Sequence, residues 1–180
     1  VYSSSGTESY QLKASFYGSS VYWWKRIQFV FGQTITCDKL KLEFVEVSVQ
    51  TIEGNSKKPV IGGLLFMQHD NPLPFQTTTG NYTNEGYLGT HQINLSHFTY
   101  NATESSAGYP LSYAFDGYFQ TCYISKKAND DTFNNEVTIN FAEKMIVSAI
   151  LIDVHYEDGH FKGSPKKIVI SSSIGSDEYK

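Results

Sequence analysis

Apolar and polar residues alternate with a period of two along the first quarter of the chain. The alternation covers Tyr10–Phe16, Lys25–Phe31 and Lys39–Phe44, in runs of a few residues each. Successive side chains of a strand point to opposite faces, so this period predicts strands that each turn one face toward a core. We therefore expect three separate strands before residue 50.

The same pattern returns from about residue 93. It predicts strands at Val137–Phe141, Ile146–Ile152 and Lys167–Ser173. No amphipathic helix of ten residues or more is evident, and glycine or proline follows nearly every apolar run. The chain is therefore predicted to be all-β, with the sandwich or jelly roll as its architecture.

Residues 51–96 lack this regularity and contain several Gly and Pro residues and a Thr-rich and Asn-rich stretch. We expect a connector here, in which Val60–Met67 forms one short strand. A connection of this length is unusual inside one compact domain. It indicates either a domain boundary or an extension that wraps the surface.

Composition and charge narrow the function classes. Aromatic residues make up 15% of the chain, with 13 Tyr and 12 Phe, which suits strands and loops that stack on sugar rings. The net charge is −4 and neither sign is collected into a block, which argues against nucleic-acid binding. No apolar run is long enough to span a bilayer, so membrane insertion is not expected.

Three N-glycosylation sequons begin at Asn81, Asn94 and Asn101. They favour an extracellular or cell-surface protein. The two cysteines, Cys37 and Cys122, would allow one disulfide in that setting. Each also lies in an apolar, strand-like context where a buried thiol is just as common, so both alternatives stay open.

Two segments at opposite ends of the chain are similar. Residues 3–10 and 172–179 both lead from a Ser run through Gly and an acidic residue to Tyr, about 169 residues apart. This spacing is close to one domain, which favours a tandem array cut at equivalent points. The alternative is that Ser-rich turns after strands are simply common.

The motif Ala114-Phe115-Asp116-Gly117, with Thr121 four residues after the glycine, carries a family resemblance. Together with the strands that follow it, residues 97–180 resemble the first half of the discoidin domain, also called the coagulation factor V/VIII C-type domain. Residues 1–50 resemble the second half of that domain. In one respect the sequence departs from the family pattern, because Cys122-Tyr123 replaces the usual Trp after the Thr.

The resemblance implies a galactose-binding-like jelly-roll sandwich, in circularly permuted order or split between two consecutive repeats. Residues 1–50 would be its C-terminal half, residues 51–96 the connector and residues 97–180 its N-terminal half. Family members that bind sugars often carry calcium, which takes oxygen ligands. The resemblance implies that these ligands are the side chains of Asp116 and Thr121, the carbonyls of Ala114 and Phe119, and the carboxylate of Glu46, with Glu43 as the alternative. Without a metal, Asp116-Gly117 would be a turn in which Asp caps local amides.

The family's recognition surface lies on loops at one end of the sandwich. The corresponding candidates in the loop after residue 99 are Tyr100, Asn101, Glu104 and Tyr109, and a second aromatic patch consists of Tyr22, Trp23 and Trp24. Aromatic faces stack on sugars while polar groups fix hydroxyls. A glycan on Asn101 would obstruct the first loop, and one of the two Trp side chains is expected to point into the core.

The alternation places Asp153, His155 and Glu157 on one strand face, but no second cluster accompanies them. We expect a solvated loop end here and not a metal or acid–base site. No nucleophile elbow, phosphate loop or metalloprotease motif occurs, so an enzyme is not expected. The sequence favours a non-catalytic module that binds carbohydrate or a cell-surface glycoprotein; the alternative is a structural repeat whose half-domains complete each other between neighbouring copies.

Overall fold

The computed structural model describes residues 11–16, 24–48, 57–68, 71–72, 76–78, 91–93, 98–117, 121–129, 134–157 and 160–175. Almost all of this is antiparallel β-structure, which confirms the all-β prediction. The strands are β1 (Gln11–Phe16), β2 (Trp24–Val47), β3 (Val60–Gln68), β4 (Asn71–Pro72), β5 (Gln76–Thr78), β6 (His91–Ile93), β7 (Phe98–Ala102), β8 (Tyr123–Ile124), β9 (Asn135–Glu157), β10 (His160–Phe161) and β11 (Pro165–Ser173). The described part also holds a short 3-10 helix, η2 (Leu111–Ala114), and no helix there is long and apolar enough to cross a membrane.

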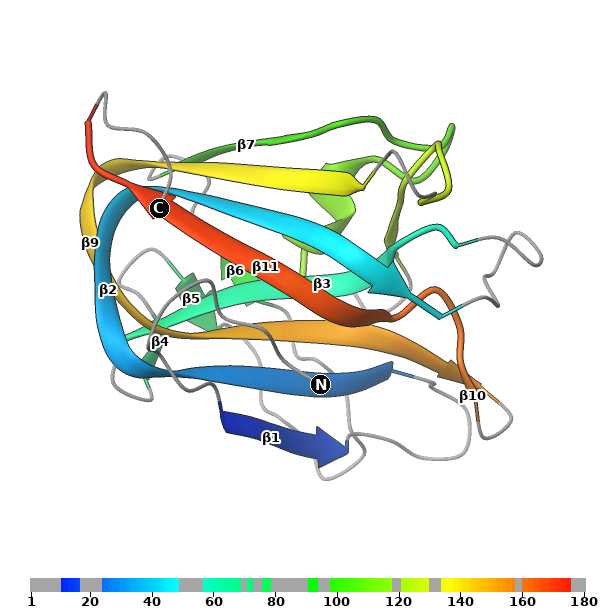
Figure 1. Cartoon of the computed structure of the whole chain (residues 1–180), viewed down its shortest axis with the longest axis horizontal. Coiled ribbons are helices and arrows are strands. Elements are labelled where there is room, and N and C mark those ends of the chain that lie inside the picture. The colour runs from blue at the N-terminus through cyan, green and yellow to red at the C-terminus, as the bar shows by residue number, and fades with distance from the viewer. Residues whose placement is uncertain are drawn as a thin grey trace.

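Two long bent strands, β2 and β9, form the frame of the molecule (Figure 1). They pair antiparallel from Trp24 opposite His155 to Phe44 opposite Asn135. The register shifts on both sides of residues 35–37, and there both strands turn back on themselves. Irregular pairing of this kind bends a strand and increases its twist. The hydrogen-bonded sheet therefore folds over into two layers.

Each layer takes one half of each long strand. In the first layer β7 pairs with the start of β9, which pairs with the end of β2, which pairs with β11. In the second layer the order is β1, the start of β2, the end of β9 and then β3, with β4 and β8 paired to β3. Segments from both ends of the sequence thus lie side by side in each layer.

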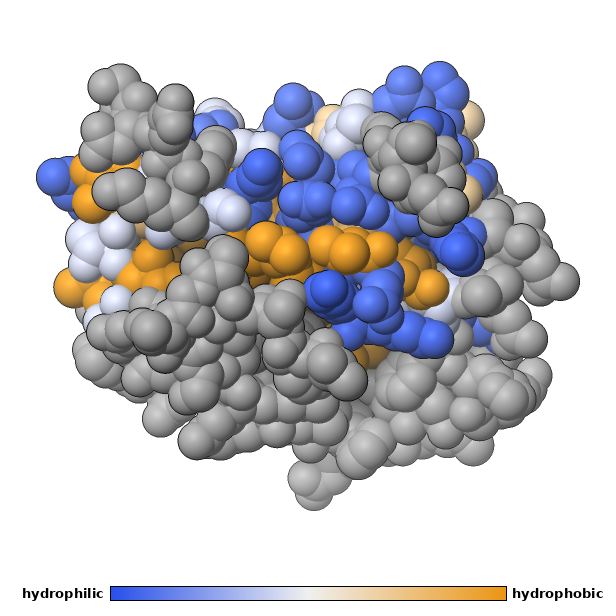
Figure 2. All heavy atoms as spheres, viewed as in Figure 1, coloured by the Kyte–Doolittle hydropathy of each residue, from blue (hydrophilic) through white to orange (hydrophobic). Residues whose placement is uncertain are grey.

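The hydrophobic core lies between the two layers. Alternate residues of each strand point inward, namely Leu40, Leu42, Phe44, Leu64, Phe66, Val137, Ile139, Ile150 and Ile152. Phe66 of one layer meets Phe141 of the other edge-on, with ring centroids 5.5 Å apart. Figure 2 shows hydrophobic residues in a band across the middle of one face, where β11 crosses it, and half-buried Ile168 and Ile170 of β11 pack against this core.

The prediction of separate strands at Lys25–Phe31 and Lys39–Phe44 was wrong, since both belong to β2. Pairing continues through the bend because Ile35 lies opposite Val147 and Cys37 opposite Met145. Val147, Cys37 and Met145 are buried there. The two strands predicted after residue 137 are likewise one strand, β9.

The strand expected within residues 51–96 is confirmed and has nine residues. β3 pairs with β9, and each residue from Val60 to Met67 is buried. Burial on both faces explains why this segment reads as a continuous apolar run and not as an alternation. The division of the chain at residues 51 and 96 remains a prediction.

No disulfide joins Cys37 and Cys122, and both thiols are buried. Burial, with a smaller effect of the neighbouring Asp38 charge, raises the pKa of Cys37 to about 12. Since the thiolate is the reactive form of cysteine, this environment makes Cys37 inert near neutral pH.

We therefore expect neither thiol to react with a chromogenic disulfide reagent at pH 8 while the protein is folded. In guanidinium chloride both thiols should react within seconds to minutes, which serves as the control for reagent and protein concentration. Rapid labelling of a cysteine in the folded protein would contradict the burial of that residue.

Candidate functional site

The loop that carries the calcium-type motif is anchored by the core. Pro110 precedes η2 in an extended conformation, and the N–H of Phe115 donates to the Ser112 carbonyl at 3.0 Å. Leu111, Ala114 and Phe115 are buried in the main cluster. The chain then turns at Gly117, whose φ of 74° lies in the left-handed region that favours glycine.

Asp116 and Thr121 lie together, as the motif predicts. The Thr121 hydroxyl donates to the carboxylate and lies 2.9 Å from Oδ1 and 2.8 Å from Oδ2 of Asp116. Both side chains are partly buried. The pair is compatible with a turn closed by a hydrogen bond and with two adjacent oxygen donors for a hard cation.

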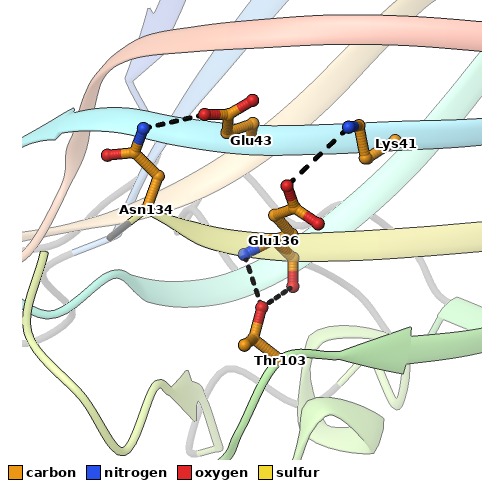
Figure 3. Close-up of polar contacts among 5 residues, drawn as sticks. All are labelled: Lys41, Glu43, Thr103, Asn134 and Glu136. Atoms are coloured by element: carbon orange, nitrogen blue, oxygen red, sulfur yellow. Dashed lines mark hydrogen bonds and ion pairs between the residues drawn. The ribbon is translucent and has the colours of Figure 1, made fainter. Parts of the chain in front are cut away.

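The other predicted ligands are dispersed. Ala114 is buried at the end of η2, and Phe119 lies outside the described residues. Glu46 is exposed near the end of β2, opposite Lys167. Glu43 accepts a hydrogen bond of 2.7 Å from the Asn134 side chain, on the outer face of the first layer (Figure 3).

A group of three or more His, Cys, Asp or Glu side chains that could hold a metal ion does not occur among the described residues. The predicted calcium ligands include only two carboxylates, those of Asp116 and Glu46, and otherwise consist of hydroxyl and carbonyl oxygens. Calcium at this loop therefore remains a prediction.

Two predicted recognition residues lie on β7, at the edge of the first layer. Tyr100 stacks on Phe115 with centroids 4.7 Å apart and planes inclined by 30°, so one face of its ring is used for packing. Asn101 is exposed opposite Thr138. The exposed Asn101 side chain is accessible for a glycan, while Asn81 and Asn94 lie outside the described residues.

The loop after β7 is held by hydrogen bonds to its neighbour. The Glu104 carboxylate is exposed and lies 3.5 Å from Lys126 Nζ, and its carbonyl accepts a bond of 3.1 Å from the Tyr123 hydroxyl. Burial raises the pKa of that tyrosine above its usual range. Tyr109 is half-buried against Cys122 and two aliphatic residues. Glu104 thus offers an exposed polar group, and Tyr109 supports the loop.

The second aromatic patch is described only in part. Trp24 opens β2 opposite His155, and its side chain lies outside what the structure describes. Tyr22 and Trp23 are also outside the described residues. Their roles as ligand residues stay predictions.

A buried ion pair that the sequence reasoning missed joins the two long strands. Arg26 Nε lies 2.7 Å from Asp153 Oδ1, and Nη2 lies 2.8 Å from Oδ2. The two side chains are only 3% and 1% exposed. Burial raises the pKa of the Asp153 carboxyl, and the Arg26 guanidinium counteracts part of that rise.

The expectation of a solvated loop end at Asp153 and His155 was wrong, because both residues are buried. β9 is flanked by β2 and β3 at this point, so Asp153 lies beside Arg26 on one side and Gly63 on the other. Ile152 and Val154 belong to the core, so Asp153 is on the opposite face of the sheet, where it is also buried. Gly63 lies opposite Asp153, and a Cβ there would overlap Oδ2 and lie 3.2 Å from Cγ. A glycine within an apolar run is the sequence signal for such a close approach.

A second missed cluster ties the loop before β9 to β2. Asn129 Oδ1 accepts bonds of 3.1 and 2.7 Å from the backbone N–H and the side chain of Asn135. The Asn135 side chain also donates to the Lys127 carbonyl at 2.8 Å, and the Asn129 side chain donates to the Phe44 carbonyl. These bonds fix the open end of the sandwich next to the candidate loops.

Comparison with known proteins gives no further identification: no protein-family model matches the chain, and no curated protein does. The resemblance to the discoidin domain therefore rests on the motif and strand order of the sequence itself.

Proposed function

We propose that this chain is a non-catalytic extracellular binding module with a discoidin-like jelly roll, and that it recognises carbohydrate on cell-surface glycoproteins. The observation that carries the proposal is the pairing of the Asp116 carboxylate with the Thr121 hydroxyl in a loop anchored by buried residues. A recognition loop of this kind needs a rigid base and exposed polar groups. The core provides the base, and Asn101 and Glu104 provide polar groups at the surface.

Asp116 and Thr121 would be the first ligands of a calcium ion at this loop. The resemblance to the discoidin domain adds the carbonyls of Ala114 and Phe119 and the carboxylate of Glu46, which the described residues do not bring together with that pair. When bound, calcium would neutralise the Asp116 charge and fix the loop through its oxygen ligands. The protein's own contribution is the hydrophobic anchoring of η2 and Phe115, which positions the loop before any ligand binds.

A glycan array probed with and without a calcium chelator tests the proposal. We expect sugar binding that falls at least tenfold with the chelator and to the same extent in Asp116→Ala. Glu143→Ala is the matched control, because it removes an exposed carboxylate from the bend of β9 and should leave binding unchanged. Absence of sugar binding to any glycan would contradict the function, and chelator-resistant binding in Asp116→Ala would contradict the calcium site.

A second candidate function is supported by the position of β2. This strand pairs with β9 in both layers and with β11 in the first. Without β2, the strands of residues 97–180 would lack the strand that joins β11 to β9. We propose as the alternative a structural repeat of a surface or filament protein, in which half-domains complete each other between neighbouring copies.

A further inference from the structure

The chain leaves β11 and begins β1 at the same end of the sandwich. The last residue of β11, Ser173, lies opposite Lys39, and the first residue of β1, Gln11, lies opposite Val30. Val30 and Lys39 flank the bend of β2 (Figure 1). A short connection could therefore lead from the end of one β11 to the start of a β1.

The sequence around these two points is similar. Residues 172–179, which follow from β11, resemble residues 3–10, which precede β1. The first residues beyond β11 are fixed on β2, since the Gly175 N–H donates to Asp38 Oδ2 at 2.7 Å and Lys39 Nζ donates to the Gly175 carbonyl. In the sequence, one type of segment thus both follows β11 and precedes β1.

We propose that Gln11–Val47, the β1–β2 segment, is exchanged between copies of the chain. A second copy would donate this segment to the sandwich made by β3, β7, β9 and β11. The proposal rests on the second candidate function and is independent of carbohydrate binding. Closed and exchanged forms contain the same contacts, so the linker after residue 48 and the protein concentration decide between them.

The contact that would select the donated segment is the buried pair of Arg26 and Asp153. Its partners are 127 positions apart and come from the donated and the receiving part, respectively. A segment without the guanidinium would leave a buried carboxylate unpaired, which is strongly unfavourable.

Cross-linking between copies tests the exchange. Lys41 of β2 and Thr138 of β9 are cross-strand partners and half-exposed. Copies carrying Lys41→Cys and copies carrying Thr138→Cys, with different tags, are refolded together at high concentration and oxidised. Directly opposite residues of paired strands have Cα separations that a disulfide can bridge. We expect a 41–138 disulfide between copies, identified by mass spectrometry.

Two controls make the result decisive. In the first, a single chain that carries both Lys41→Cys and Thr138→Cys should form the 41–138 bond internally when refolded at high dilution. In the second, copies with Lys41→Cys are mixed with copies that carry Glu143→Cys, and the cross-link between copies should be at least tenfold weaker. The proposal is overturned if the double variant forms its bond and the mixed copies do not. Failure of the double variant would also overturn it, because β2 would then not pair with β9 as described.

Adding Arg26→Met to the Lys41→Cys copy tests the selecting contact. The mixture also contains chains with an unmodified β1–β2 segment, which compete with the Arg26→Met segment for the Thr138→Cys copies. We expect the yield of the 41–138 cross-link to fall several-fold in this competition. An unchanged yield would show that the ion pair does not select the segment.

Discussion

Replacing Arg26 with methionine is expected to lower the free energy of unfolding by about 3–5 kcal/mol. The substitution keeps a long apolar side chain but leaves the Asp153 carboxylate buried beside Gly63 with its bidentate guanidinium partner removed. Equilibrium unfolding in urea at pH 7.5 measures the loss. A decrease of less than about 1 kcal/mol, the value typical of exposed pairs, would contradict the buried placement of this pair.

Two variants serve as controls. Lys41→Met removes one partner of the ion pair with Glu136, whose atoms lie 3.7 Å apart on the outer face of the first layer (Figure 3). That pair is partly exposed, and its loss should cost about 0–1 kcal/mol. Replacing Arg26 with Met and Asp153 with Leu together should recover most of the stability lost in the single variant, because no charge is then left buried.

The stability deficit of Arg26→Met should also depend on pH. Burial raises the folded-state pKa of Asp153, and removing Arg26 removes the charge that counteracts this rise. A carboxyl whose pKa is higher in the folded state than in the unfolded chain, where it is about 4, stabilises the fold while it is protonated. That stabilisation is complete below the unfolded-state pKa and is lost as pH rises through the folded-state pKa. The deficit should therefore shrink between pH 8 and pH 5, and a deficit that grows on acidification would contradict this account.

Gly63→Ala is expected to cost about 3 kcal/mol, far more than the usual effect of adding one methyl group. The new Cβ would overlap Asp153 Oδ2 and displace the carboxylate from Arg26. β9 is an interior strand at this point, paired with β2 and β3, so Asp153 has little room to shift. Denaturant unfolding again measures the change.

The cause of this loss can be separated from a general intolerance of alanine. In a background with Arg26→Met and Asp153→Ala, the contacts of the new Cβ with Oδ2 and Cγ no longer exist, and the nearest remaining Asp153 atom is 3.5 Å away. Gly63→Ala should then cost less than about 1 kcal/mol, and the two effects should be strongly non-additive. Equal costs in both backgrounds would indicate that backbone conformation, and not the carboxylate, requires glycine.

Local patterning predicted the strands but not their continuity. The alternation in residues 39–44 and 137–141 identifies one core face correctly, since Leu40, Leu42, Val137 and Ile139 all point inward. It could not show that β2 and β9 continue through their bends, because the residues there do not alternate regularly. Their pairing depends on partners that are 91 to 131 positions away.

The candidate site shows the same limit. Asp116 and Thr121 are five positions apart, so a short motif was enough to bring them together. Arg26 and Asp153 are 127 positions apart, and no local pattern relates them. The placement of Asp153 between Arg26 and Gly63 follows from the order of β2, β9 and β3 in the second layer, which the periodicity of single strands does not specify.

β2, from the first quarter of the sequence, lies at the centre of a sandwich whose other strands come mainly from the last third. Amide hydrogen exchange tests this claim most directly. β2 is paired on both sides between residues 39 and 44, with β9 and with β11. The account predicts that the amides of Leu40–Phe44 and Val137–Phe141 open with the same free energy, that of global unfolding. Exchange of the β2 amides that is orders of magnitude faster than that of the β9 amides would contradict it.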